Sequence, residues 1–573
     1  EQRMKNSHVN LGLNMISFTA FHTLPQCNPF LYHRSQIPFH FNTFQSPLIQ
    51  TKWKFIPKTR LNMKQPGQST RVSVDNSTPS EKPLKKGQLL DISIDSLSYG
   101  GEGVTRLNDG FVVLTNSVIP GEKVRVRIIK SKKNLAKGAV VERLEESHHY
   151  IPPKCPHVAP TGCGGCQSQH LEYLIQLSEK QKQVEYLFRD GMISGGVPQV
   201  EIIQGCEKIF GYRNKMEFSF GTREWLVNPP EKKSNDEEPN SEVTVQAPFI
   251  LGLRPRGHFD KTLSIDACYL QHEQANQVLD YVRNRLMEVP SSVQAELRPY
   301  DNREHTGTLR NLAIRSAINT DGQLELMVNF VTSPQDVTHF LLQDIANALP
   351  QRIPEVKSVM QNMTESKGGA TFGECGQKVL FGREYIEQDL LGYSFQISAN
   401  SFFQTNPYQA SVLYKEIQRH ADLNGDEIVH DLFCGTGSIG ICLAEKCRQV
   451  IGIELVESAV EDARRNAKRN NITNASFYAD NLDKSSLIES LPKADVVVID
   501  PPRAGCHPSL IKHLINTKPR KIVYVSCNPA SQVRDIQLLS VDELYKLAKV
   551  SPVDMFPHTP HIESVVTLEL HQH

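Results

Sequence analysis

The stretch Asp431-Leu432-Phe433-Cys434-Gly435-Thr436-Gly437-Ser438-Ile439-Gly440 decides the expected fold of the C-terminal part of the chain. The residues that lead into it, 427–432, predict a buried strand, and residues 441–447 predict a helix after it. Glycines let the backbone between a strand and a helix pass close to a ligand. The stretch is therefore typical of a turn that binds a nucleoside or dinucleotide.

Strand and helix patterns alternate from residue 388 to the end, which predicts a catalytic α/β domain over 388–573 with a doubly wound parallel sheet. The next strand, 449–455, carries Glu454 near its end, where a carboxylate can accept hydrogen bonds from both ribose hydroxyls of a nucleoside cofactor. Taken alone, Gly435-x-Gly437-x-x-Gly440 also matches the dinucleotide fingerprint. An NAD-binding domain is thus a competing interpretation, and a purely structural tight turn is another.

Two later strands end in chemically distinctive residues. Residues 494–499 lead into Asp500-Pro501-Pro502-Arg503, and residues 521–525 lead into Ser526-Cys527-Asn528-Pro529. In an open parallel sheet, ligands and reactive groups gather at the carboxyl ends of the strands, so Glu454, Asp500 and Cys527 are expected to face one crevice. Hydride transfer has no need of a cysteine there, which favours covalent chemistry.

Cys527 suits methylation of carbon 5 of a uracil ring. That carbon is a poor nucleophile, but a thiolate that adds to carbon 6 makes it electron-rich, and a base must later remove the carbon 5 proton. Glu563, just before the final strand, is the expected base, and His561 is the second choice. Arg503 is a candidate cation for lowering the pKa of the Cys527 thiol.

These residues belong to a series of motifs that resembles the RNA 5-methyluridine methyltransferase family. The motifs are, in order, Phe402-Phe403-Gln404-Thr405-Asn406, Asp431 to Gly437, Asp500-Pro501-Pro502-Arg503-Ala504-Gly505, Val525 to Pro529, and His558-x-x-His561-x-Glu563. The resemblance implies a class I Rossmann-like S-adenosylmethionine methyltransferase domain, with Cys527 as nucleophile and Glu563 as base.

The same resemblance implies a set of contacts to S-adenosylmethionine. They are Gln404, Phe433, Ser438, Glu454, Asn481 and Asp500. Many members of the family carry asparagine where Ser438 stands, and Asn481 is placed only by the alignment of Asp480-Asn481-Leu482 after a predicted strand.

Three cysteines cluster as Cys155-x7-Cys163-x2-Cys166, which suits a zinc or iron-sulfur site once a fourth ligand arrives. In the ribosomal-RNA branch of the family such a cluster resembles a 4Fe-4S site whose fourth ligand lies well downstream, where Cys268 stands. Cys206 is the fallback fourth ligand, and zinc is the alternative metal.

Alternating runs separated by glycine turns predict a small antiparallel barrel over 85–146. Its order and its turn Ser98-Tyr99-Gly100-Gly101-Glu102-Gly103-Val104 resemble the TRAM domain, an RNA-binding barrel. A group of basic side chains near its end suits RNA phosphates, with a solvated strand face as the ordinary alternative. The group consists of Arg125, Arg127, Lys130, Lys132, Lys133 and Lys137.

The remaining segments complete the expected domain plan. Residues 147–387 mix strands and helices and are expected to form a central α+β RNA-binding domain that carries the metal cluster, with a disordered polar insertion at 228–246. Residues 1–84 are rich in basic and hydroxyl side chains and nearly free of acidic ones, which is typical of a transit peptide, towards a plastid in preference to a mitochondrion. An untranslocated disordered tail is the alternative.

Composition limits the class of protein without naming a partner. The 573 residues carry 63 basic and 63 acidic side chains, so any RNA-binding surface must come from local segregation of charge. Twelve cysteines in so long a chain are typical of a reduced compartment. Because no apolar run of about 18 residues occurs, no membrane span is expected. We expect a monomer with no obligate protein partner.

Three functions compete at this point. Methylation of uridine in structured RNA is favoured, in organellar large-subunit ribosomal RNA or in the T-loop of transfer RNA. Methylation of cytosine at carbon 5 would use the same thiolate addition. A noncatalytic RNA-binding or RNA-folding factor is the third, and the presence of every expected catalytic residue argues against it. Since a paired base cannot reach Cys527, the target is expected to lie in a loop or to be flipped out.

Overall fold

The computed structural model describes residues 84–158, 162–190, 198–227, 244–367, 374–484 and 487–571. Contacts divide the chain into Glu1–Thr78 and Pro79–His573, and every described residue belongs to the second unit. The predicted transit peptide therefore lies outside the described residues, apart from Leu84. Within the described ranges, no helix has the length and apolar character needed to cross a membrane.

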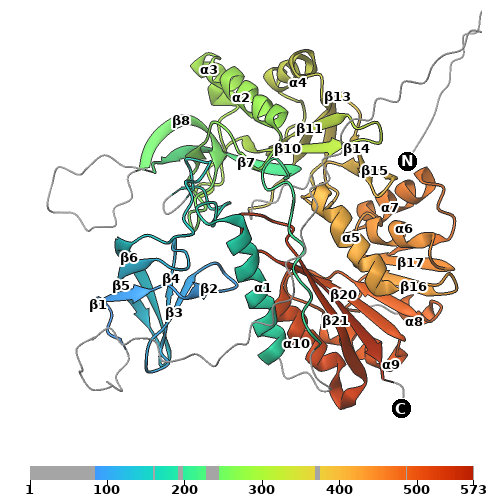
Figure 1. The fold of residues 1–573 in the computed structure, drawn as a ribbon. Helices are drawn as coiled ribbons and strands as arrows, with labels where there is room; N and C mark the ends of the chain where they lie inside the picture. The colour runs from blue at the N-terminus through green and yellow to red at the C-terminus, as the bar shows by residue number, and fades with distance from the viewer. Residues whose placement is uncertain are drawn as a thin grey trace, which may run out of the picture. The chain divides into compact units, whose positions relative to one another are not determined.

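Six strands form the first sheet, in the order β1-β5-β6-β4-β3-β2 (Figure 1). They are β1 (Leu89–Ser93), β2 (Ser96–Leu97), β3 (Gly103–Arg106), β4 (Val112–Thr115), β5 (Lys123–Ser131) and β6 (Leu135–Glu145). Val124, Val126 and Ile128 alternate along β5 and enter the buried core of this sheet. The sheet is antiparallel as predicted except at one pair, because β5 first pairs with β1 and the chain then returns as β6, which lies parallel to β4.

Helix α1 (Tyr173–Asp190) connects the first sheet to the C-terminal sheet. Its Glu179 carboxylate accepts a 2.8 Å hydrogen bond from the Leu97 amide of β2. One residue along, the Lys180 ammonium donates a 2.6 Å hydrogen bond to Asp554 in the loop before the last strand. The helix therefore joins two parts of the chain that are far apart in sequence.

The central sheet has the strand order β13-β12-β11-β10-β7-β8-β9. Its elements are β7 (Lys215–Trp225), β8 (Thr244–Leu253), β9 (Leu263–Ser264), α2 (Glu273–Met287), α3 (Ser291–Glu296), β10 (Leu309–Ile318), β11 (Leu324–Thr332), α4 (Phe340–Arg352), β12 (Val356–Met363) and β13 (Gln377–Gly382). The predicted insertion at 228–246 ends too late, because residues 244–246 pair with β7 as part of β8. Residues 228–243 lie outside the described residues.

A two-stranded hairpin, β14 (Tyr385–Leu390) with β15 (Tyr393–Ser398), follows the central sheet. The predicted boundary between residues 387 and 388 falls inside β14, so it does not separate two elements. Ile386 and Phe395 of the hairpin share one buried cluster with Met327 of the central sheet and Val429 of the C-terminal sheet.

The C-terminal sheet has the strand order β18-β17-β16-β19-β20-β22-β21 (Figure 1). Its elements are α5 (Pro407–Ala421), β16 (Ile428–Leu432), α6 (Ser438–Ala444), β17 (Gln449–Glu454), α7 (Glu457–Arg469), β18 (Ala475–Ala479), α8 (Leu487–Ser490), β19 (Val496–Ile499), α9 (Pro508–Thr517), β20 (Lys521–Ser526), α10 (Pro529–Leu539), the 3₁₀ helix η1 (Val541–Glu543), β21 (Tyr545–Val553) and β22 (Glu563–Leu570).

The sheet is doubly wound as predicted but not wholly parallel. Strands β16 to β20 are parallel, whereas β22 runs antiparallel to both β20 and β21. The loop between β21 and β22 contains no helix, and a connection without a crossover joins antiparallel strands. Helix α6 also begins three residues before its predicted start, at Ser438, where the Asp431 carboxylate accepts a 2.8 Å hydrogen bond from the Gly440 amide.

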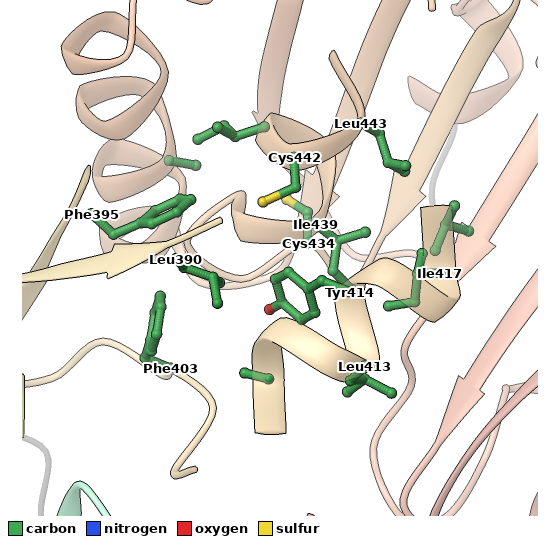
Figure 2. Close-up of a cluster of buried hydrophobic side chains, with 14 of the residues drawn as sticks. Leu390, Phe395, Phe403, Leu413, Tyr414, Ile417, Cys434, Ile439, Cys442 and Leu443 are labelled. Carbon is green, nitrogen blue, oxygen red and sulfur yellow. The ribbon is translucent and has the colours of Figure 1, made fainter. Parts of the chain in front are cut away.

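A buried cluster supports the glycine-rich turn from below. Figure 2 shows Tyr414 of α5 beside Ile439, with the sulfurs of Cys434 and Cys442 close to the same turn. The Tyr414 hydroxyl lies 2.7 Å from the Ser438 hydroxyl. Packing on α5 therefore fixes the start of α6 and with it the turn that faces the crevice.

Candidate active site

The register of two strands brings Cys527 and Glu563 together. Ser526, the last residue of β20, pairs with Ser564 of the antiparallel strand β22. Continuing this register by one residue places Cys527 opposite Glu563, and side chains at opposite positions have Cβ atoms about 5 Å apart. Each of the two groups lies within the electrostatic field of Asp500 and Arg503.

The loop that carries Cys527 is held by short hydrogen bonds. The Ser526 hydroxyl accepts a 3.0 Å hydrogen bond from the Asn528 amide, and helix α10 begins immediately afterwards at Pro529. The Asn528 side chain donates a 2.9 Å hydrogen bond to the Arg503 carbonyl. Cys527 therefore stands in a hydrogen-bonded turn just before a helix, next to the loop that carries Arg503.

Burial has the largest effect on the pKa of the Cys527 thiol. Burial raises its pKa to about 11, and the nearby Glu563 and Asp500 carboxylates raise it further. The Arg503 guanidinium, which hydrogen-bonds the sulfur, acts in the opposite direction. Arg503 thus has the position that was expected of it, but its charge does not outweigh burial.

Glu563 and His561 have opposite shifts for the same reason. Burial raises the pKa of the Glu563 carboxyl well above its usual value, and the charge of Asp500 adds to the rise. Burial lowers the pKa of His561 to about 4, with Arg503 acting in the same direction. A carboxyl with a raised pKa is a stronger base once it is ionised, so Glu563 fits the role of base better than the neutral imidazole.

The turn after β16 leaves room for a ligand. Gly435 has φ +54°, and no atom lies within 4 Å of the place where its Cβ would be. Its amide donates a 3.1 Å hydrogen bond to the Glu454 carboxylate, which also accepts from the amides of Leu455 and Val456. The carboxylate therefore stands at the edge of open space beside the turn, as a ribose-binding group must.

Of the other expected cofactor residues, Phe433, Ser438 and Asn481 follow the carboxyl ends of β16 and β18, whereas Gln404 precedes helix α5. Phe433 has a left-handed backbone at φ +64° and donates its amide to the Ile453 carbonyl. Ser438 is buried against Tyr414. The Asn481 side chain accepts a 2.9 Å hydrogen bond from the Asp483 amide, after β18. Gln404 is buried, and its carbonyl accepts a 3.2 Å hydrogen bond from Asn214 of the central part of the chain.

Asp500 lies between the cofactor turn and the nucleophile. Its charge acts on Asp431 on one side and on Cys527 and Glu563 on the other. Burial raises the pKa of Asp500 to about 7, and burial also raises that of Asp431 to about 7. This accumulation of carboxyl groups suits a ligand that carries a positive charge.

The four cysteines of the expected metal site line one cavity. Its volume is about 540 Å³, and Cys155, Cys163, Cys166 and Cys268 all reach it, together with Arg213, Arg315 and His561. Burial raises the pKa of Cys163 to about 11 and that of Cys166 to about 12, and the other cysteines of the group add to both rises. The structure therefore brings Cys268 to the three clustered cysteines.

Cys206, the fallback ligand, lies elsewhere. Its thiol donates a 3.2 Å hydrogen bond to the Lys208 carbonyl and accepts one from the Asn406 side chain. It is absent from the residues that line the cysteine cavity in the described part of the chain.

Several residues of the site escaped sequence reasoning. The buried pair Lys180 and Asp554 fixes the loop before Glu563, and the Gln176 side chain accepts a 3.0 Å hydrogen bond from the His558 amide in the same loop. Tyr99, from the first sheet, contacts the backbone of Cys527. The signal available for Lys180 was its place in an amphipathic helix. The signal available for Tyr99 was its place inside a glycine-rich turn.

Comparison with known proteins identifies the family. Residues 371–571 match the family model described as tRNA (Uracil-5-)-methyltransferase, and residues 83–141 match the TRAM domain. The chain is 38% identical over 482 residues to an uncharacterized RNA methyltransferase of Porphyromonas gingivalis, covering 83% of this chain and 99% of that protein. It is 36% identical over 494 residues to another from Halalkalibacterium halodurans, covering 86% and 99%.

A solved structure extends the likeness. It is the tRNA (uracil-54, C5)-methyltransferase of Pyrococcus abyssi in complex with S-adenosyl-L-homocysteine, with 27% identity and a TM-score of 0.62 over 84% of this chain and all of that one. Fold and site together define an S-adenosylmethionine-dependent RNA methyltransferase with an N-terminal TRAM domain. Within that class, the chain belongs to the RNA uracil-5-methyltransferase family. The predicted family and fold class are thereby confirmed.

Proposed function

We propose that the protein methylates carbon 5 of a uridine in organellar large-subunit ribosomal RNA, through a transient covalent bond between Cys527 and carbon 6. The main support for this reaction is the pairing of Ser526 with Ser564. Continued by one residue, this register sets Cys527 and Glu563 side by side at the end of the sheet, where one can act as nucleophile and the other as base.

The reaction needs two deprotonated groups in sequence. The Cys527 thiolate adds to carbon 6, and the ring electrons move to carbon 5, which takes a methyl group from the donor. S-adenosylmethionine supplies that methyl as an electrophile on a sulfonium. The Glu563 carboxylate then removes the proton from carbon 5, the bond between sulfur and carbon 6 breaks, and the thiolate leaves.

The surrounding charges support this order of events. Burial raises the pKa of both Cys527 and Glu563, so that each group loses its proton less readily in the empty site than in water. The exposed Arg503 can pair with negative charge that develops on the sulfur. A cationic donor near Asp500 would favour the ionised form of that carboxyl.

RNA binding is attributed to the TRAM sheet and the central part of the chain. Of the basic side chains noted in the sequence, Arg125 is paired with Asp91 and Glu142, and Lys137 is paired with Glu102. The other four are exposed on β5 and the turn after it. They are Arg127, Lys130, Lys132 and Lys133. These four are the better candidates for contacts to phosphates.

We propose that Cys155, Cys163, Cys166 and Cys268 hold a 4Fe-4S cluster with a structural or RNA-shaping role. Their shared cavity fits a group of this kind. Around a single zinc ion the sulfurs would lie about 3.8 Å apart. Zinc is the alternative metal, since cysteine spacing alone does not separate the two.

Transfer RNA is the second candidate substrate. The description of the matching family and the name of the Pyrococcus abyssi relative both specify transfer RNA, the latter at uracil 54. The combination of TRAM domain and cysteine site supports ribosomal RNA, and the composition of residues 1–84 supports a plastid, with a mitochondrion as the alternative.

Mapping of 5-methyluridine in organellar ribosomal and transfer RNA, with and without the protein, tests the substrate. Loss of one site in large-subunit ribosomal RNA is expected, and loss of a T-loop site instead would establish the second candidate. Incubation of the protein with labelled donor and unmodified RNA tests the reaction: 5-methylcytidine as product would contradict the proposal. Unchanged biological activity of Cys527→Ala would favour a noncatalytic role.

A covalent adduct provides the direct test of mechanism. RNA that contains 5-fluorouridine has no removable proton at carbon 5, so the reaction is expected to stop with protein and RNA joined through Cys527. Absence of this adduct with the intact enzyme and donor would overturn the mechanism.

A further inference from the structure

The turn between β2 and β3 of the TRAM sheet docks on the catalytic loop. A Cβ on Gly101, whose φ is +78°, would lie 2.9 Å from the side-chain oxygen of Gln167 and 3.3 Å from the Cβ of Pro560. Gln167 follows the cysteine Cys166, and Pro560 lies three residues before Glu563. The tip of the turn is therefore packed between the cysteine loop and the loop of the base.

Helix α1 holds this turn from the other side. The Leu97 amide donates a 2.8 Å hydrogen bond to Glu179, and the Leu97 carbonyl accepts a 3.1 Å hydrogen bond from Gln183. Within the turn, the Gly101 amide donates a 2.8 Å hydrogen bond to the Ser98 carbonyl. Since both its base and its tip are fixed, the turn presents the side chain of Tyr99 in one direction.

That side chain reaches the nucleophile. The Tyr99 hydroxyl donates a 2.8 Å hydrogen bond to the backbone carbonyl of Cys527, across 428 positions of sequence. Its ring packs against the buried cluster that contains Phe188 of α1 and Tyr524 of β20. Burial raises the pKa of Tyr99 to about 12, so the hydroxyl remains a donor at any pH at which the enzyme works.

The Cys527 carbonyl lies between two regular elements and belongs to neither. The hydrogen-bonded pairing of β20 with β22 ends at Ser526, and helix α10 does not begin until Pro529. The orientation of the peptide that follows Cys527 fixes the direction of its Cα–Cβ bond and hence of the thiol. A hydrogen bond to this carbonyl therefore helps to orient the sulfur towards carbon 6 of the uracil ring.

We propose that Tyr99 is a positioning residue for the methyl transfer, by which the TRAM domain completes the active site of the catalytic domain. This inference rests on the proposed reaction of Cys527. It assigns to the turn a role in catalysis that is separate from phosphate binding, because its contact is with the nucleophile's own backbone.

Tyr99→Phe tests the proposal, because it removes the hydroxyl and keeps the ring. In methylation assays with saturating donor, kcat is expected to fall about fivefold to tenfold, which is the effect of losing one well-aligned hydrogen bond. The KM for RNA should stay within about twofold. The rate at which the adduct with 5-fluorouridine RNA forms should fall by the same factor as kcat, because sulfur addition is the step affected. Tyr186→Phe is the matched control, since Tyr186 is an exposed tyrosine on α1, and it should leave all three values unchanged.

Each other outcome overturns the inference. A raised KM with unchanged kcat would make Tyr99 an RNA contact only. A lower melting temperature with full activity at low temperature would make it only a packing residue. Wild-type rates in every assay would remove it from the reaction. If wild-type protein itself neither methylates RNA nor forms the adduct, the proposed function fails, which is distinct from a failure confined to Tyr99→Phe.

Discussion

The ammonium of Lys180 lies 2.6 Å from the carboxylate of Asp554, and both side chains are almost fully buried. Tyr173 donates a second hydrogen bond of 2.8 Å to the same carboxylate. Burial lowers the pKa of Lys180, and the charge of Asp554 opposes that shift. The pair ties α1 to the loop that leads to His558 and Glu563, so the geometry of the base depends on a helix that begins about 390 residues earlier in the chain.

Lys180→Met is therefore expected to be strongly destabilising. Removing one partner leaves a buried carboxylate uncompensated, at a cost of about 3–5 kcal/mol. Urea unfolding followed by circular dichroism measures this cost. Lys182→Met is the control: its side chain is 61% exposed and pairs with Glu179, so its effect should stay below about 1 kcal/mol. Equal stability of the two variants would show that the pair does not hold the loop.

Glu563→Gln should trap the reaction after methyl transfer. Without a base, the carbon 5 proton stays in place and the sulfur cannot leave, so a methylated covalent complex with ordinary uridine RNA should accumulate. Denaturing electrophoresis detects it as a shifted band. Glu569→Gln, at the far end of β22, should turn over normally. If Glu563→Gln turns over like the wild type, the base is another group, and His561→Ala becomes the informative variant.

Activity should rise with pH through the neutral range. The pKa of Cys527 is raised to about 11 and that of Glu563 is raised well above its usual value, chiefly by burial. Both groups act when deprotonated, so kcat/KM for RNA should increase from about pH 6 to about pH 9. A carboxyl with an unshifted pKa of about 4.3 would already be fully ionised over this range and would contribute no such increase. Initial rates in buffers of constant ionic strength measure this. A flat profile over that range would contradict the shifted pair.

Donor binding should also strengthen with pH. The pKa of Asp500 is about 7 because of burial, and a cation bound nearby favours the ionised carboxylate. Below pH 7 binding must displace a proton, whereas above it the carboxylate is already charged, so the Kd of S-adenosylmethionine should fall between pH 6 and pH 8. Calorimetry in two buffers should show proton release. Asp431 has a similar pKa, so Asp500→Asn is needed to assign the effect. S-adenosylhomocysteine, which lacks the sulfonium charge, should show a smaller pH dependence.

Serine substitutions test the cluster ligands. Cys155→Ser, Cys163→Ser, Cys166→Ser and Cys268→Ser should each reduce iron content and brown colour in anaerobically purified protein. Cys206→Ser and the exposed Cys375→Ser should retain both. Full iron content in Cys268→Ser together with loss of iron in Cys206→Ser would show that Cys206, and not Cys268, is the fourth ligand. Colourless wild-type protein with stoichiometric zinc would show that the four cysteines hold zinc and not an iron-sulfur cluster.

Many local elements and the family could be inferred from the amino-acid sequence. Runs of apolar side chains predicted the starts of β17 and β20, because a strand that is buried on both faces leaves a direct record in its side chains. The proposed nucleophile, the proposed base and the glycine-rich turn could be singled out because each stands at a strand end with residue types that have few other uses there. Pairing direction leaves no such record, so the reversal of β22 and the parallel pairing of β4 with β6 were not predicted.

Only the tertiary structure decided how separate segments meet at one site. The register of β20 and β22 sets Cys527 opposite Glu563. The chain fold brings Cys268, and not Cys206, to the cavity that the other three cysteines line. The pKa shifts arise from burial, which depends on packing across the whole fold and not on neighbours in sequence. The contact of Tyr99 with Cys527 has the same origin: a side-chain hydroxyl and a backbone carbonyl that are 428 positions apart in sequence become neighbours only when the domains dock.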